Sequence, residues 1–70
     1  MKAIHATAGA LRPGDRIVER RDGGVVERVV TVRTVAPCPA DRHAVHVNAA
    51  PGRPGSECYS VLPPMEIRRG

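Results

Sequence analysis

The residue types best suited to chemistry are two cysteines and two histidines, namely Cys38, His43, His46 and Cys58. Two thiolates and two imidazoles together match the ligand set of a tetrahedral zinc ion. Structural zinc sites usually draw paired ligands from Cys-x2-Cys knuckles, and the sequence contains no such pair. Along a strand, moreover, His43 and His46 point to opposite faces. We therefore predict no metal site, and zinc binding is the minor alternative.

The same cysteines raise the possibility of a disulfide, which requires Cα atoms within about 7 Å of each other. The N-terminal residues lack the apolar core of a signal peptide, and no apolar run is long enough to span a membrane. These features predict a soluble cytoplasmic protein. Because cytosolic thiols are kept reduced, we expect Cys38 and Cys58 to be free, with a disulfide as the alternative.

Catalytic groups are not evident in the sequence. A Cys–His pair would need an oriented base and a pocket that stabilises the developing charge. A chain of 70 residues offers little concave volume, and it shows no Ser-His-Asp order and no paired carboxylates. We predict that the protein is not an enzyme and uses no cofactor.

Arginine supplies the remaining chemistry, since Lys2 is the single lysine among 11 basic residues and the formal net charge is +4. Guanidinium groups bind phosphate through charge-assisted hydrogen bonds, so nucleic acid is one candidate partner and a protein is another. The predicted nucleic-acid-binding residues are Arg16, Arg20, Arg21, Arg28 and Arg53. Acidic residues in the same segment favour a salt-bridged, solvated surface instead: Asp15, Glu19, Asp22 and Glu27. Arginine-rich coding bias is a further alternative.

The elements that position these side chains are predicted to be strands. The apolar residues are mainly valine, with no Phe and no Trp, and β-branched side chains suit a pleated sheet. Scattered Gly and Pro leave no long helical stretch. The predicted strands are Lys2 to Ala6, Asp15 to Arg21, Val25 to Val35, His43 to Ala49, Glu57 to Val61 and Met65 to Arg68.

Turn signals separate these strands. Pro13-Gly14 fits a type II turn, and Asp22-Gly23-Gly24 predicts a hairpin that pairs the second and third strands. In the third predicted strand, valines do not stay on one of the two alternating sets of positions. Val30 and Val32 belong to one set, and Val25, Val29 and Val35 belong to the other. This predicts a bulge or bend between residues 28 and 30. The proline-containing segments 36–42 and 50–56 are predicted loops.

The order of these features resembles that of the SH3-like barrels, including the KOW-type barrels of translation and transcription proteins. The resemblance rests on the segments Leu11 to Val32 and Leu62 to Ile67, and it is one of fold, because no glycine stands between Val25 and Val35 where KOW domains have one. It implies a single domain over residues 1–70 that forms a closed antiparallel barrel of five or six strands.

Two classes of function follow. The first is a non-enzymatic nucleic-acid-binding accessory domain that uses the arginine-rich hairpin and Arg53. The alternative is a protein-interaction module, for example a phage-encoded or actinobacterial regulator, that binds one host protein through the loops 36–42 and 50–56. A third possibility is a subunit that forms homo-oligomers through its edge strands.

Overall fold

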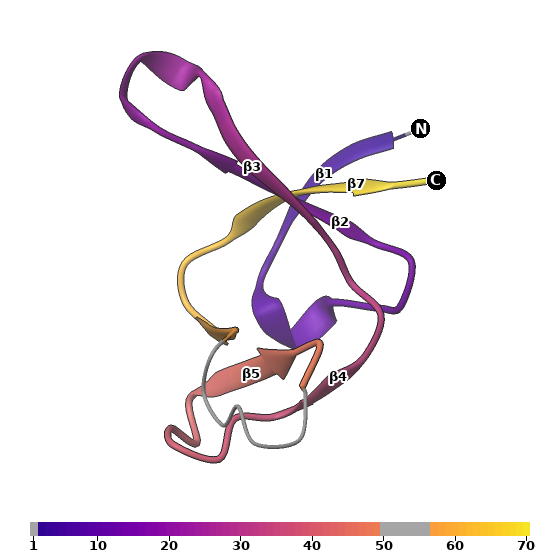
Figure 1. Cartoon of the computed structure of the whole chain (residues 1–70), viewed down its shortest axis with the longest axis vertical. Coiled ribbons are helices and arrows are strands. Elements are labelled where there is room, and N and C mark those ends of the chain that lie inside the picture. Colours follow the sequence, from indigo (N-terminus) through magenta and orange to yellow (C-terminus); the bar gives the residue numbers. More distant parts are fainter. Residues whose placement is uncertain (1, 50–56) are drawn as a thin grey trace.

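The computed structural model describes residues 2–49 and 57–70, which form two antiparallel sheets (Figure 1). The first sheet has the strand order β1-β7-β2-β3, and the second has the order β4-β5-β6. The strands are β1 (Lys2–Ala6), β2 (Arg16–Arg20), β3 (Val26–Thr31), β4 (Val35–Pro37), β5 (Ala44–Val47), β6 (Cys58–Ser60) and β7 (Met65–Arg69). Two short 3-10 turns, η1 (Ala8–Ala10) and η2 (Asp22–Gly24), complete the described elements.

The antiparallel, all-β class predicted from the valine content is therefore confirmed, and the described residues contain no α-helix. The strands belong to two separate hydrogen-bonded sheets, so closure into an SH3-like barrel stays a prediction. The hairpin of β2 and β3 is confirmed. Gly14, Gly23 and Gly24 all have positive φ values, as the predicted turns require.

The core lies between the two sheets and is built from small β-branched side chains. Ile67 is the register partner of both Ile4 on β1 and Ile17 on β2, which aligns three isoleucines across the first sheet. Val47 on β5 is fully buried in the same cluster, so it joins the second sheet to the first. Alternation of side chains along each strand directs these residues inward.

The long strand predicted from Val25 to Val35 is divided into β3 and β4, which belong to different sheets. A register shift in the β2–β3 pairing leaves Glu27 without a register partner, next to the predicted bulge. Val32 is buried, whereas Val25 and Val29 are exposed, so the valines of this segment are not all core residues.

The predicted loop 36–42 is wrong at its start, because Ala36 and Pro37 belong to β4. β4 is an edge strand of the second sheet, where the missing N–H of proline costs no ladder hydrogen bond. The second predicted loop, 50–56, lies outside the described residues.

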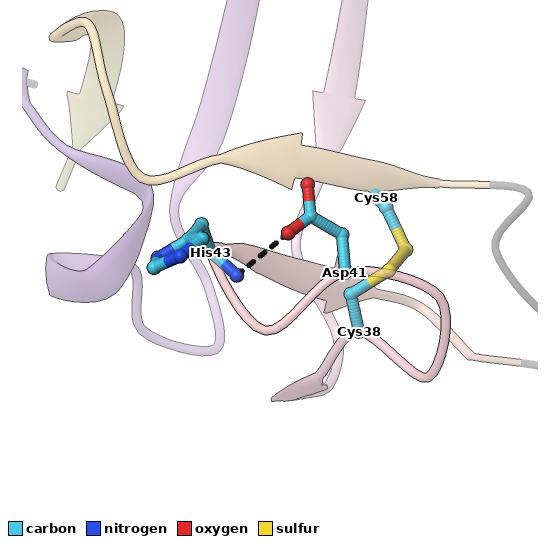
Figure 2. The surroundings of a disulfide bond; sticks show 4 residues. All are labelled: Cys38, Asp41, His43 and Cys58. Atoms are coloured by element: carbon cyan, nitrogen blue, oxygen red, sulfur yellow. Dashed lines mark hydrogen bonds between the residues drawn. A yellow bond between two sulfur atoms is a disulfide. The ribbon is translucent and has the colours of Figure 1, made fainter.

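A disulfide joins Cys38 to Cys58, contrary to the expectation of free thiols (Figure 2). Cys38 directly follows β4 and Cys58 begins β6, and their Cα atoms are 5.9 Å apart. β5 lies between these two strands in the sheet order. Asp41 accepts a hydrogen bond from the backbone N–H of His43 at 2.8 Å, which shapes the turn that precedes β5. The expectation of free thiols was wrong because it was based only on the reducing character of the cytosol. The sequence alone does not give the distance between the two cysteines.

Candidate nucleic-acid interface

The arginines predicted from the sequence do not form one surface. Strand alternation places Arg16 and Arg20 on the outer face of the first sheet, whereas Arg28 is the register partner of Glu19 and lies on the opposite face. Arg21 is exposed beside the hairpin turn. Arg53 lies outside the described residues.

Arg28 belongs to a cluster that ties the two sheets together. Its Nε donates to Glu19 Oε1 at 2.6 Å, and its guanidinium also lies 3.5 Å from Glu57, which precedes β6. Tyr59 on β6 donates its hydroxyl to Glu19 Oε2 at 3.2 Å. The hydrogen bond from Arg28 holds the pKa of Glu19 below its ordinary value. Arg28 therefore has a structural partner in each sheet.

Arg20 is also paired, but on the outer face. Its Nε donates to Glu66 Oε1 at 2.6 Å and its Nη2 to Glu66 Oε2 at 3.0 Å, a bidentate arrangement. Its Nη1 donates to the carbonyl oxygen of Gly24 at 2.6 Å. These contacts fix Arg20 between β7 and the hairpin turn, which reduces its availability to a phosphate group.

Charge is divided between the two ends of the first sheet. Around the hairpin, five carboxylates outnumber three arginines: Glu19, Asp22, Glu27, Glu57 and Glu66 against Arg20, Arg21 and Arg28. The opposite end contains the start of β1, the turn before β2, the residues after β3 and the end of β7. We call its six cationic residues the basic end: Lys2, Arg12, Arg16, Arg33, Arg68 and Arg69. In the part of the chain that the structure describes, Asp15 is the one acidic side chain at this end.

Backbone pairing brings these distant segments together. Arg69 on β7 is the register partner of Lys2 on β1, so the first and last strands end side by side (Figure 1). Gly14 donates its N–H to the carbonyl oxygen of Val32 at 2.8 Å, which places the turn before β2 next to the residues that follow β3. The hairpin turn projects on the other side of the molecule (Figure 1).

Arg16 and Arg68 form the centre of the basic end, because they are direct register partners between β2 and β7. Their outer neighbours in the same row are Thr31 on β3 and Ala3 on β1. Side chains of such partners have Cβ atoms roughly 5 Å apart, and like charges in this position repel each other.

Arg69 has a different part in the same end. Its guanidinium donates to both carboxylate oxygens of Asp15, and its Nη2 also donates to the carbonyl oxygen of Ala10 at 3.1 Å. The side chain of Asp15 is 3% exposed, and it also accepts the N–H of Arg12 at 2.9 Å. This pair fastens the last strand to the turn before β2.

An open pocket of about 420 Å³ lies where β7 separates from β2. Its polar lining comes from His5, Glu19, Arg20, Tyr59 and Glu66, and its apolar lining includes Val18 and Met65. Both carboxylates are already paired with arginines. The pocket therefore presents a nearly neutral surface and no charge that would select a ligand.

The described residues contain no group of three or more His, Cys, Asp or Glu side chains suited to a metal ion. The sulfur atoms of Cys38 and Cys58 are bonded to each other, so neither is available as a thiolate ligand. His46 is buried, and its Nε2 has no hydrogen-bond partner within the described segments. No helix in the described ranges has the length and apolar character needed to cross a membrane.

Sequence reasoning identified Arg16 but missed the other members of the basic end. Arg68 was assigned to a closing strand whose neighbours were not predicted, and Arg69 was left just outside that strand, so the sequence did not place them beside Arg16 and Lys2. The signal that could have found them is the pairing of the first and last strands, which a barrel-like fold requires.

Comparison with known proteins adds no relationship: no protein-family profile matches the chain, and neither curated proteins nor solved structures give a match.

Proposed function

We propose that this protein is a non-enzymatic domain that binds nucleic acid through phosphate contacts at its basic end. The observation that carries the proposal is that cationic residues from both ends of the chain, from the turn before β2 and from the residues after β3 gather at one end of the first sheet. Phosphate groups accept charge-assisted hydrogen bonds from guanidinium groups, so such a surface suits a phosphate-bearing partner.

The surroundings of Arg16 and Arg68 support a polyanion as the partner. Lys2, Arg12 and Arg33 are exposed around Arg16 and Arg68, and they come from three different segments of the chain. Cationic residues that bind several neighbouring phosphates release the counterions of those phosphates. The affinity of such a complex therefore falls steeply as the salt concentration rises. The hairpin surface lacks this property, because its carboxylates outnumber its arginines.

The test compares two matched substitutions in a fluorescence anisotropy titration with labelled DNA at several salt concentrations. Arg68→Gln removes one cation of the central pair, and we expect weaker binding and a salt slope reduced by about one. Arg21→Gln is the control, since it removes an exposed arginine at the hairpin turn. Circular dichroism verifies that both variants are folded.

Two results would overturn the proposal. One is binding by the wild-type protein that does not change with salt, or no binding. The other is loss of affinity in Arg21→Gln with none in Arg68→Gln, which would return the interface to the hairpin.

A second candidate function is self-association through β3, which is an edge strand of the first sheet. Val26 and Val29 on this strand are 39% and 43% exposed, and the strand contains neither Pro nor Lys, two residues that protect sheet edges. Sedimentation velocity over a range of concentrations tests it. A dimer that dissociates in Val29→Lys is expected, and a monomer at high concentration contradicts it.

A further inference from the structure

We infer that β3 pairs with β3 of a second copy of this chain in antiparallel orientation, and that this dimer covers cations of the basic end. The inference rests on the proposed functions, and it names the orientation of the partner and its effect on nucleic-acid binding. Its first basis is the open edge of the first sheet. β3 is paired with β2 on one side only, and five of its six residues are exposed. The other side presents unpaired backbone N–H and C=O groups, which a further strand can satisfy.

The second basis is an apolar strip along this edge. Val26 is the register partner of Arg20, and Val29 is the register partner of Val18. Because Arg20 and Val18 are two positions apart on β2, their partners share the outer face of the sheet. The register shift in the pairing with β2 therefore turns both exposed valines to the same face. In a two-fold interface the same strip of both copies meets, so each copy covers the valines of the other.

The third basis is the difference in charge between the two ends of this edge. At the hairpin end, Asp22 and Glu27 are exposed, and neither forms an ion pair among the described residues. Arg21 is the exposed cation beside them. The other two arginines of the hairpin are bound to carboxylates of the same chain. The exposed charge of this end is therefore acidic.

The opposite end of the same edge is cationic. Arg33 follows β3 by two positions and is exposed, and it forms no ion pair within the described segments. The turn that contains Arg12 lies beside it, because Gly14 donates its N–H to the carbonyl oxygen of Val32. The hairpin turn and this end lie on opposite sides of the molecule (Figure 1).

These charges select the orientation of the second copy. Antiparallel pairing places each hairpin turn beside the residues that follow β3 in the partner, so Asp22 and Glu27 approach the partner's Arg33. Two-fold symmetry repeats this favourable contact at the other end of the interface. Parallel pairing would instead bring the two acidic ends together and the two cationic ends together.

The same geometry limits access to the basic end. The partner's hairpin lies against Arg33 and next to the turn that contains Arg12, and both residues belong to the basic end. A polyanion and the second copy therefore compete for these cations. Binding of nucleic acid to the monomer shifts the equilibrium away from the dimer by mass action.

Sedimentation velocity of the intact protein over a range of concentrations tests the orientation. We expect a dimer that weakens as the salt concentration rises, because its charge pairs are exposed. Arg33→Glu should weaken dimerisation about tenfold or more, since the symmetric interface contains the substitution twice. Arg42→Glu is the matched control, because Arg42 is exposed on the turn before β5 in the second sheet. Circular dichroism verifies that the variants are folded.

A charge exchange between two variants separates loss of attraction from loss of fold. The double variant Asp22→Lys, Glu27→Lys should dimerise weakly by itself, as Arg33→Glu should. A mixture of the two restores opposite charges at both ends of the interface, so we expect a heterodimer at concentrations where each variant alone is a monomer. Addition of labelled DNA to the wild-type dimer should release monomer that sediments with the DNA.

The outcomes separate this inference from the functions on which it rests. A dimer that Arg33→Glu leaves intact overturns the antiparallel orientation, although self-association itself stands. A dimer that stays intact while it binds DNA overturns the competition. A monomer at every concentration overturns self-association together with this inference and leaves nucleic-acid binding in place. Failure of the monomer to bind DNA overturns the proposed nucleic-acid function, whereas the dimer contacts are judged by the charge variants alone.

Discussion

Arg69 donates two parallel hydrogen bonds of 2.8 Å to Asp15, one to each carboxylate oxygen, across 54 positions of sequence. The hydrogen bond from this guanidinium is the main reason why the pKa of Asp15 is lowered, and burial opposes it. The pair holds the end of β7 against the turn before β2. It therefore supports the strand that carries Arg68.

The pH dependence of stability should reflect this pair. Above its ordinary pKa of 3.8, Asp15 is ionised in the folded and unfolded states, and its full contribution is present. As the pH falls, the unfolded chain takes up the proton first, so the contribution is lost as the pH passes through the lower pKa of the folded protein. Urea unfolding should show this loss in the wild type, and Asp15→Asn should be less stable by about 2 kcal/mol near neutral pH. An unchanged acid profile in Asp15→Asn contradicts the prediction.

Tyr59 should titrate well above an ordinary tyrosine. Burial, and then the charges of Glu19 and Glu57, raise its pKa to about 12 from the ordinary 10.0. The neutral phenol is favoured in the folded state, so this stabilisation is present below pH 10 and is lost as the pH rises through the folded pKa. Because Tyr59 is the single tyrosine, its absorbance change on ionisation reports this group alone. Glu19→Gln should lower the pKa of Tyr59. A pKa of Tyr59 near 10 in the wild-type protein would contradict the prediction.

The disulfide should contribute strongly to the stability of the second sheet. Cys38 and Cys58 are separated by 20 positions. Closing a loop of that size lowers the conformational entropy of the unfolded chain, which raises the free energy of unfolding by about 3 kcal/mol. The double variant Cys38→Ser, Cys58→Ser should unfold at correspondingly lower urea concentration. The wild-type protein under reducing conditions is the matched control and should behave in the same way. Equal stability of the oxidised protein and the double variant would show that the bond adds nothing.

Asn48 should be required to join the two sheets. Its Oδ1 accepts the N–H of Arg33 at 2.6 Å, and its Nδ2 donates to the carbonyl oxygen of Thr31 at 2.8 Å. Its φ of 56° is a conformation that asparagine tolerates better than alanine does. Asn48→Ala should lower the free energy of unfolding by about 2 kcal/mol. Asn48→Gly keeps the backbone conformation without these hydrogen bonds, so a glycine variant as stable as the wild type would show that the side chain is dispensable.

His46 should tolerate an apolar replacement. Its Nε2 is buried and has no hydrogen-bond partner among the described residues, and an unsatisfied polar atom of this kind costs stability. We expect His46→Leu to be at least as stable as the wild type in thermal unfolding. A marked decrease would mean that the imidazole has a partner that contributes to the fold.

Local sequence patterns were sufficient for most strands, because alternation and turn residues are properties of neighbouring positions. The strand predicted from Lys2 to Ala6 matches β1, and the hairpin at Gly23 is as predicted. β4 was missed because Pro37 argues against a strand unless the strand lies at an edge, which is a property of the whole sheet.

The candidate interface was less accessible to sequence reasoning, because it depends on register between strands far apart in the chain. Arg28 was placed with Arg16 and Arg20, but a register change of one residue moves a side chain to the other face. Arg68 becomes a neighbour of Arg16 only through the β2–β7 pairing. No local pattern contains that information.

The pairing of β1 with β7 also has a kinetic consequence. Ile4 and Ile67 meet in the core although almost the whole chain lies between them. Formation of this contact closes a very large loop, and proteins dominated by such contacts fold slowly for their size. During synthesis β1 leaves the ribosome first, yet it has no partner until β7 emerges. The basic end, which these two strands build together, is therefore the last part of the first sheet to assemble.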